Sequence, residues 1–259
     1  MLLKDNFDES GFVVITGLLT KTEIDELTKQ VDHVFTPWFH ANHSDILTYK
    51  LVNMHSLTKS AYFDSSLERV AFFNAMSPKS LVNLLADMFG SDLYFHNTQL
   101  FFNPLNTNQL PYWHRDLQFS STSDDVQQKE QHNMLSLHIR IPLEKETGVE
   151  LIPQTHKRWD TQLENEVRFE RNGRKNHETL PHSKLISLDV GDVLIFSSQM
   201  LHRGNYQLNK SRKALDICAG KYHPLTFDYF DQQVLPTDKE KTEINNAQWF
   251  TNAQLHSKN

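Results

Sequence analysis

The sequence has 259 residues, of which 38% are hydrophobic, 22% charged and 11% aromatic. This composition is that of a globular protein with a sizeable core, and it excludes a disordered or fibrous chain. The net charge of −6 and the pI near 6.1 provide no basic surface, so neither nucleic acid nor an anionic membrane is an expected partner.

Cysteine content and the N-terminus bear on the cell compartment. The single cysteine, Cys218, cannot form an internal disulfide, and the opening residues MLLKDNFDES lack the apolar segment of a signal peptide. No apolar run approaches the roughly 18 residues needed to cross a bilayer. We therefore expect a cytoplasmic protein. Cys218 itself lies in an apolar strand, which favours a buried core residue over a nucleophile.

The first 90 residues are predicted to be rich in helix. GFVVITGLL, at 11–19, predicts a short strand, and Thr20 with Glu23 forms a capping box for an amphipathic helix. A second helix is expected to begin near Ser65. A third should have Ser77 as its cap, with Pro78 at its first position and Gly90 just past its end.

From residue 91 to about 222 the pattern changes to strands in series, separated by turn residues. The predicted strands are LYFHNTQLFF, MLSLHIRIPL, KLISLDVGDVLIF and KALDICAGKY. Strands without intervening helices favour a sandwich or barrel over a parallel α/β sheet. In MLSLHIRIPL the alternation places Leu137 and Ile139 on one face and Ser136, His138 and Arg140 on the other. If the N-terminal helices cover the apolar face, the polar face looks into the barrel.

Two polar segments, 120–133 and 160–183, are expected to be long loops between strands. Loops of this length serve as lids or binding loops, and a solvated insertion explains them equally well. The C-terminal extension, 223–259, can pack on the body of the protein or on a second subunit to form a homo-oligomer. The sequence leaves both open.

The stretch YWHRDLQF contains a candidate pair of metal ligands, His114 and Asp116. Residues two apart on a strand project to the same side, so the pair can bind one ion. With 14 histidines in the chain, such a pair also arises by chance, and a second one, His43 and Asp45, lies among the N-terminal helices. Only the surrounding residues distinguish the two pairs.

A candidate third ligand and a cationic side chain that could bind a cosubstrate both follow His114 in the strand-rich region. His202 ends the apolar run GDVLIFSSQMLHRG, and Arg212 lies ten positions later. Two histidines and one carboxylate form the facial triad of non-haem Fe(II) oxygenases, which leaves coordination positions open. A 2-oxoacid can occupy two of them and O2 the third, while the guanidinium of Arg212 can pair with a distant carboxylate.

Taken together, these motifs resemble the phytanoyl-CoA dioxygenase family of Fe(II)- and 2-oxoglutarate-dependent oxygenases, over roughly residues 10–222. The matching stretches, in order, are GFVVITGLLTKTEIDEL, YWHRD, TGVELIPQTHK, LDVGDVLIFSSQMLHRG and SRKAL. The resemblance implies that His114, Asp116 and His202 bind Fe(II) and that Arg212 binds 2-oxoglutarate. It also implies hydroxylation, because related halogenases have a small residue in place of Asp116.

The implied fold is mainly β with flanking helices: a double-stranded β-helix, also called a jelly roll or cupin-like fold, with N-terminal helices packed on one sheet. The chain is expected to be a single oxygenase domain, 1–259, with a helix-rich part at 1–90 and the jelly-roll core at about 91–222. The implied reaction uses O2 and 2-oxoglutarate to hydroxylate an aliphatic C–H bond of a small-molecule or acyl substrate. It releases succinate and CO2.

Further residues are candidates for contact with cosubstrate or substrate. His138 and Arg140 face the expected barrel interior, where they either touch a ligand or are satisfied by neighbouring polar groups. Gln99 is a similar candidate, whereas Trp113 is expected to pack beside the metal. In the family, the histidine equivalent to His156 belongs to a structural turn.

The sequence departs from the family pattern at two positions. Gln154 stands where a glycine is common, which concerns a turn, and Gly204 stands where a serine often binds the cosubstrate. The second departure concerns one contact to the cosubstrate.

Two other classes of function stay open: a non-catalytic cupin-like binding protein, and a metal-dependent hydrolase that uses the same triad to activate water. Arg212 argues against both, because neither function needs a cation placed some distance from the metal to bind the far carboxylate of a cosubstrate. The hydrolase also lacks an evident general base near WHRD.

Overall fold

A computed structural model describes residues 2–227 and 230–257. The α-helices are α1 (Leu2–Ser10), α2 (Lys21–Ala41), α3 (His43–Tyr49), α4 (Ser66–Met76), α5 (Lys79–Phe89), α6 (Asp124–Glu130), α7 (Gln162–Arg168), α8 (Pro224–Phe227), α9 (Asp238–Lys241) and α10 (Gln248–Ser257). The 3-10 helices are η1 (Ser60–Tyr62), η2 (Asp116–Phe119) and η3 (Gln232–Val234). The strands are β1 (Phe12–Ile15), β2 (Asn53–His55), β3 (Tyr94–Phe102), β4 (Ser136–Pro142), β5 (Glu146–Leu151), β6 (Lys184–Leu188), β7 (Val193–Ser197), β8 (His202–Arg203) and β9 (Lys213–Gly220).

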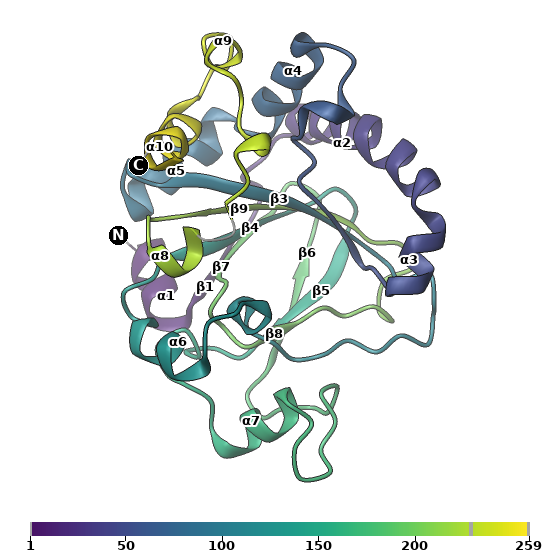
Figure 1. The fold of residues 1–259 in the computed structure, drawn as a ribbon, viewed down its shortest axis with the longest axis vertical. Helices are drawn as coiled ribbons and strands as arrows, with labels where there is room; N and C mark the ends of the chain where they lie inside the picture. Colours follow the sequence, from purple (N-terminus) through teal and green to yellow (C-terminus); the bar gives the residue numbers. More distant parts are fainter. Residues whose placement is uncertain (1, 228–229, 258–259) are drawn as a thin grey trace.

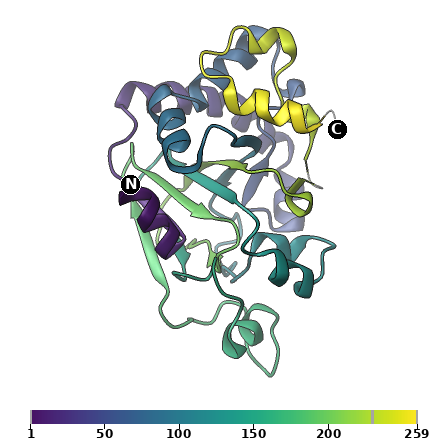
Figure 2. The ribbon, with the colours of Figure 1, turned by 90° about the vertical axis from the view of Figure 1, so that its left-hand side faces the viewer.

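The strands form two antiparallel sheets. The larger has the order β1-β7-β4-β9-β3-β2, and the smaller has the order β6-β5-β8. Figure 1 shows helices α2, α4, α5 and α10 gathered on one side of the larger sheet, with the smaller sheet on its other side. Figure 2, turned by 90°, shows the same helical layer above the strands and α7 at the opposite end. Among the described residues, helices contain more residues than strands, so the chain is mixed rather than mainly β.

The main hydrophobic core lies between the larger sheet and the helices. Leu137 and Ile139 of β4 are fully buried there, together with Leu27 of α2, Phe73 of α4 and Phe250 of α10. These side chains come from the first helices, the sheet and the C-terminal helix, so the core joins both ends of the chain. The apolar face predicted from the alternation in β4 is the face that the helices cover.

Local sequence preferences explain where the helices begin. Thr20 forms the predicted capping box with Glu23 at the start of α2, and the Ser65 hydroxyl accepts the N–H of Glu68 at the start of α4. The third predicted helix begins one residue later than expected. Pro78 is its N-cap, and the Ser77 hydroxyl instead donates to the carbonyl of Phe73, in the preceding helix.

Several other elements differ from the expectation. The segment predicted as one strand over 184–196 divides into β6 and β7, which belong to different sheets. A turn stabilised by Asp192, whose carboxylate accepts the N–H groups of Gly17 and Asp189, separates the two strands. The predicted loops at 120–133 and 160–183 contain α6 and α7, and the second of these helices has a capping box formed by Thr161 and Glu164.

The described part of the C-terminal extension packs on the body of the same chain. Phe250 of α10 is fully buried, and the Asn252 amide donates to the carbonyls of Ser91 and Leu93 beside β3. Residues 228, 229, 258 and 259 of this extension lie outside the described residues. None of the described helices has the length and apolar character needed to span a membrane.

Candidate metal centre and cosubstrate site

His114 and His202 lie beside one another where the chain before η2 meets β8. The backbone N–H of each residue donates to the carbonyl of the other at 3.0 Å. The Nδ1 of His114 donates to the carbonyl of Tyr112 at 3.1 Å, and the Nδ1 of His202 donates to that of Met200 at 3.0 Å. Because these bonds place the ring proton on Nδ1, the lone pair of Nε2 is left free in both rings.

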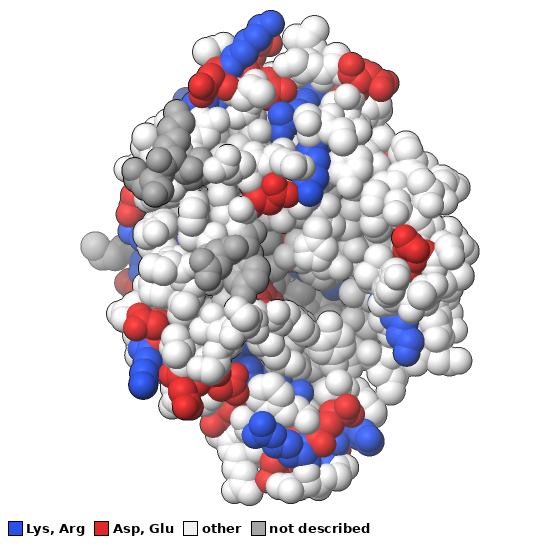
Figure 3. Space-filling model, in the orientation of Figure 1, with Lys and Arg blue, Asp and Glu red and all other residues white. Residues whose placement is uncertain are grey.

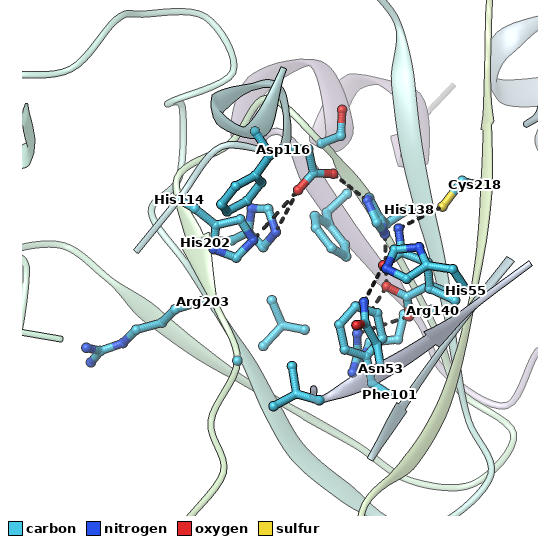
Figure 4. Close-up of a pocket in the computed structure, with 18 of the residues that line it drawn as sticks. Asn53, His55, Phe101, His114, Asp116, His138, Arg140, His202, Arg203 and Cys218 are labelled. Atoms are coloured by element: carbon cyan, nitrogen blue, oxygen red, sulfur yellow. Dashed lines mark hydrogen bonds and ion pairs between the residues drawn. The ribbon is translucent and has the colours of Figure 1, made fainter. Parts of the chain in front are cut away.

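Asp116 completes a three-residue cluster with the two histidines. Its backbone N–H donates to the carbonyl of Ser198 at 3.2 Å, which holds the start of η2 against the chain before β8. Its Oδ1 lies 3.7 Å from Nε2 of His114 and 3.4 Å from Nε2 of His202. The three ligand atoms lie within 4.8 Å of one another, so they can bind one metal ion. Figure 4 shows both imidazoles directed toward the Asp116 carboxylate.

The charges of the cluster suit a divalent cation. Burial lowers the pKa of His202 to about 3, with a further contribution from His114, and burial also lowers the pKa of His114. Burial alone would raise the pKa of Asp116, but His138 and His202 lower it. At neutral pH the imidazoles are therefore neutral and the carboxylate is ionised, which are the forms that bind metals.

The cluster lies in a cavity of about 570 Å³. Figure 3, which has the orientation of Figure 1, shows a hollow near the centre of the face toward the viewer. The cavity is lined by the metal cluster and by all four of the other predicted ligand-contacting residues: Gln99, His138, Arg140 and Arg212. Its volume lies within the range of about 300–1,000 Å³ of small-molecule sites.

Arg212 is buried in this cavity and only partly satisfied. Its Nε donates to Oε1 of Glu146, and its ring neighbours are Phe101 and Tyr206, whose centroids lie 5.4 and 5.9 Å from the guanidinium carbon. Its Nη1 is buried and has no hydrogen-bond partner among the described residues. An unpaired guanidinium N–H in a cavity is suited to an incoming carboxylate.

His138 and Arg140 both contact charged side chains in the cavity wall. His138 hydrogen-bonds Asp116 and Asp216, and Arg140 pairs with Asp216 and Glu146. The sequence reasoning missed Asp216 and Glu146. For Asp216 there was an indication in the sequence: it is the one acidic residue in the strand KALDICAG, and it lies between the core residues Leu215 and Ile217.

Gln99 and Cys218 line another part of the cavity wall. The Gln99 carbonyl oxygen accepts from the amide of Asn53, and its Nε2 donates to Sγ of Cys218 at 3.7 Å. Burial raises the pKa of Cys218 to about 11, so the thiol is neutral at physiological pH. This agrees with the expectation that Cys218 is not a nucleophile.

Residues near the cluster anchor the surrounding loops. Arg115, between the two ligands of the His-x-Asp pair, is buried and pairs with Asp160 at 2.9 Å, while its Nη1 donates to the carbonyls of Thr155 and Gln199. Trp113 is fully buried and donates to the carbonyl of Glu178 at 2.8 Å. The two contacts attach both ends of the 160–183 segment to the residues that flank His114.

The structure shows why glycine is common at position 154, and it explains the departure at Gly204. Gln154 has a φ of +67°, a region that favours glycine, and it lies in a turn where His156 contacts the carbonyl of Asp8. At Gly204, a Cβ atom would lie 2.8 Å from the Tyr206 ring and 3.3 Å from Nη1 of Arg212. Tyr206 therefore fills the space that a side chain at position 204 would need.

The other His-x-Asp pair lies elsewhere. His43 and Asp45 are exposed on α3, where residues two apart point in different directions. Neither residue belongs to the three-ligand cluster found among the described residues.

Three solved structures illustrate the fold similarity. HygX from Streptomyces hygroscopicus, solved with nickel and 2-oxoglutarate bound, aligns with a TM-score of 0.57 at 14% identity, over 85% of this chain and 86% of that chain. EctD from S. alaskensis, solved with 2-oxoglutarate and 5-hydroxyectoine, gives 0.56 at 14% identity, over 84% and 74%. SnoN, described as a non-heme alpha ketoglutarate dependent epimerase from nogalamycin biosynthesis, gives 0.56 at 15% identity, over 86% and 83%.

At these identities the structural similarity concerns the fold. No curated protein gives a significant sequence match. The family model described as phytanoyl-CoA dioxygenase (PhyH), in contrast, matches residues 7–214, which is most of the sequence. The chain therefore belongs to the phytanoyl-CoA dioxygenase family.

Proposed function

We propose that the protein is an Fe(II)- and 2-oxoglutarate-dependent dioxygenase that hydroxylates an aliphatic C–H bond of a small-molecule or acyl substrate. The observation that carries the proposal is the sharing of one cavity by the three-ligand cluster and by a buried arginine with a free N–H. HygX and EctD, which share the fold, were both solved with 2-oxoglutarate. Family membership supports the same chemistry.

The residues present fit the proposed metal and cosubstrate. His114, Asp116 and His202 offer two neutral nitrogens and one carboxylate oxygen, the donor set of non-haem Fe(II) oxygenases. Arg212 has the unsatisfied Nη1 that a carboxylate of 2-oxoglutarate would bind. When bound, the iron would supply activation of O2, with 2-oxoglutarate oxidised to succinate and CO2 and one oxygen atom inserted into the substrate C–H bond.

The chain's own part in this mechanism is binding and orientation. The carbonyls of Tyr112 and Met200 fix the tautomers of the two histidines, and the ladder between His114 and His202 fixes their spacing. Tyr112 and Phe196 contribute apolar surface to the cavity beside the cluster, where a substrate carbon is held away from bulk water.

The finer assignments of fold and location belong to this proposal. We assign the two antiparallel sheets to a double-stranded β-helix and the whole chain, 1–259, to a single oxygenase domain. A cytoplasmic location and assembly into a homo-oligomer stay predictions from the sequence. The preference for a small-molecule substrate rests on the size of the cavity.

The test is succinate formation by purified protein supplied with Fe(II), 2-oxoglutarate and O2. Dioxygenases of this kind release some succinate even without the proper substrate, so the expected result is slow, iron-dependent succinate formation. A His202→Ala variant should form none. The proposal would be contradicted if protein that is verified to contain iron formed no succinate, either alone or with the substrates tested. That result would favour a binding protein or a hydrolase. Once a substrate is found, the mass of the product separates hydroxylation, which adds one oxygen, from epimerisation, which adds nothing.

A further inference from the structure

A continuous series of buried polar contacts joins the metal cluster to Arg212. His138 Nε2 lies 2.6 Å from Oδ2 of Asp116, and its Nδ1 lies 2.9 Å from Oδ2 of Asp216. Arg140 then donates to Asp216 at 3.0 and 3.1 Å. Figure 4 shows the first contact of the series, between Asp116 and His138.

The series continues through Glu146 to the cosubstrate anchor. Arg140 donates to both carboxylate oxygens of Glu146, at 2.8 and 3.0 Å, and Arg212 Nε donates to Oε1 of Glu146 at 2.6 Å. Asp216, Arg140 and Glu146 are each at most 1% exposed. We call the four intermediate residues, His138, Asp216, Arg140 and Glu146, the connecting series.

The sheet sets the spacing of these side chains. Arg140 and Asp216 are directly opposite one another in the β4 and β9 ladder, and His138 lies two residues before Arg140 on the same face. Two adjacent strands of the larger sheet therefore position the middle of the series. Charged groups this deeply buried are costly unless every one of them is paired, and here each is.

At the metal end, the contact with His138 divides the roles of the two Asp116 oxygens. Oδ1 lies nearest to Nε2 of His114 and His202, at 3.7 and 3.4 Å, whereas Oδ2 is occupied by His138. A short hydrogen bond to Oδ2 draws on its electron density and fixes the orientation of the carboxylate, which favours binding of a metal through Oδ1. Binding through both would use a coordination position that the cosubstrate and O2 need.

We propose that His138 is a positioning residue that restricts Asp116 to a single metal-facing oxygen, and that the rest of the connecting series holds Arg212 at a fixed distance from that oxygen. The proposal rests on the proposed function, because it assigns these residues to a metal and a dicarboxylate cosubstrate. Hydrogen-bonding partners of metal ligands change metal affinity by about 10–100-fold when they are removed.

The first experiment measures Co(II) binding and the absorption spectrum of the Co(II) protein, which responds to coordination number. His138→Leu should weaken Co(II) binding by about 10–100-fold and change the spectrum, because the freed Oδ2 of Asp116 becomes available. His138→Gln, which retains a side-chain N–H donor, should restore much of the affinity. His96→Gln, at another cavity-lining histidine, is the matched control and should bind Co(II) as the wild type does.

Two results would overturn the role of His138. The first is Co(II) affinity and a spectrum unchanged in folded His138→Leu protein. The second is an equal loss in folded His138→Gln and His138→Leu, since a hydrogen-bonding role requires that the amide rescues. Neither readout depends on turnover, so an enzyme that forms no succinate but shows these differences would contradict the proposed function and still support this inference.

The second experiment tests the other end of the connecting series and does not need a His138 variant. Glu146→Gln should weaken binding of 2-oxoglutarate by about tenfold and leave Co(II) affinity unchanged, because Arg212 loses the carboxylate that orients it. If Glu146 instead competed with the cosubstrate for Arg212, the same variant would bind 2-oxoglutarate more tightly. Tighter or unchanged binding would overturn this part of the proposal.

Discussion

The two faces of the larger sheet differ in what they do. On the face toward the helices, β4 and β9 present Leu137, Ile139, Leu215 and Ile217, all fully buried in the main core. On the opposite face the same strands present His138, Arg140 and Asp216, buried as well but paired by charge. Alternate residues of the same strands thus form the hydrophobic core and the wall of the site. We therefore expect substitutions on one face to change mainly stability and those on the other to change mainly ligand binding.

The largest expected effect is on the cavity face. Asp116→Ala removes the charged ligand of the cluster, so metal affinity should fall by more than about 100-fold. Equilibrium dialysis with Fe(II) or Co(II) measures the affinity. Asp45→Ala, in the exposed pair on α3, is the control and should leave metal binding unchanged.

The complementary change is Ile139→Ala on the helical face. Removing a fully buried aliphatic side chain should lower the free energy of unfolding by about 2–5 kcal/mol. Denaturant unfolding gives this value, and metal affinity measured on folded protein should match that of the wild type. A variant that lost metal affinity while keeping its stability would show that the two faces are not independent.

Arg212→Met should weaken binding of the cosubstrate and leave the affinity for metal unchanged. Loss of a charge-assisted hydrogen bond costs about 1.5–3 kcal/mol, which corresponds to a rise of roughly 10–150-fold in the Kd for 2-oxoglutarate. Arg203→Met is the matched control: Arg203 also lines the cavity and pairs with a carboxylate, Glu150, but Figure 4 shows its guanidinium directed away from the metal cluster. Equal effects of the two substitutions would mean that Arg212 acts through the fold and does not bind the cosubstrate.

The smallest effect at neutral pH concerns His96. Burial, with a contribution from His138, lowers its pKa to about 4, whereas the unfolded chain protonates it near 6.5. Between these values the unfolded state binds more protons, so stability falls as pH falls, by up to about 1.4 kcal/mol per pH unit. His96→Gln should therefore lose less stability between pH 6.5 and 4, measured by denaturant unfolding. If the stability of the wild type and of His96→Gln depended on pH in the same way, the lowered pKa of His96 would be contradicted.

Much of the fold followed from local patterns in the sequence. The capping box at Thr20, the cap at Ser65 and the alternation in β4 each depend on neighbours a few residues away, and the structure has these features as predicted. The division of 184–196 into two strands could not be predicted in this way. The local bond from the Asp189 N–H to Asp192 makes the turn, but the separation of the two strands into different sheets depends on pairing with distant strands: β6 pairs with β5, and β7 pairs with β1 and β4.

For the site, too, local sequence patterns predict some residues and miss those that depend on tertiary contacts. His114, Asp116, His202 and Arg212 are found from motifs, and the structure brings all four to one cavity. Glu146 and Asp216 carry no motif, and their importance comes from pairing with Arg140 across strands and loops. Whether a buried acidic residue is paired is decided by tertiary contacts, so a single sequence gives little indication of it.

The most direct test of the account is a calorimetric titration of 2-oxoglutarate, without O2, into the protein with and without Fe(II). If the metal cluster and Arg212 form one site, 2-oxoglutarate should bind once per chain, at least tenfold more tightly with iron than without it. Binding that is indifferent to iron, or that is absent from verified iron-loaded protein, would contradict the account.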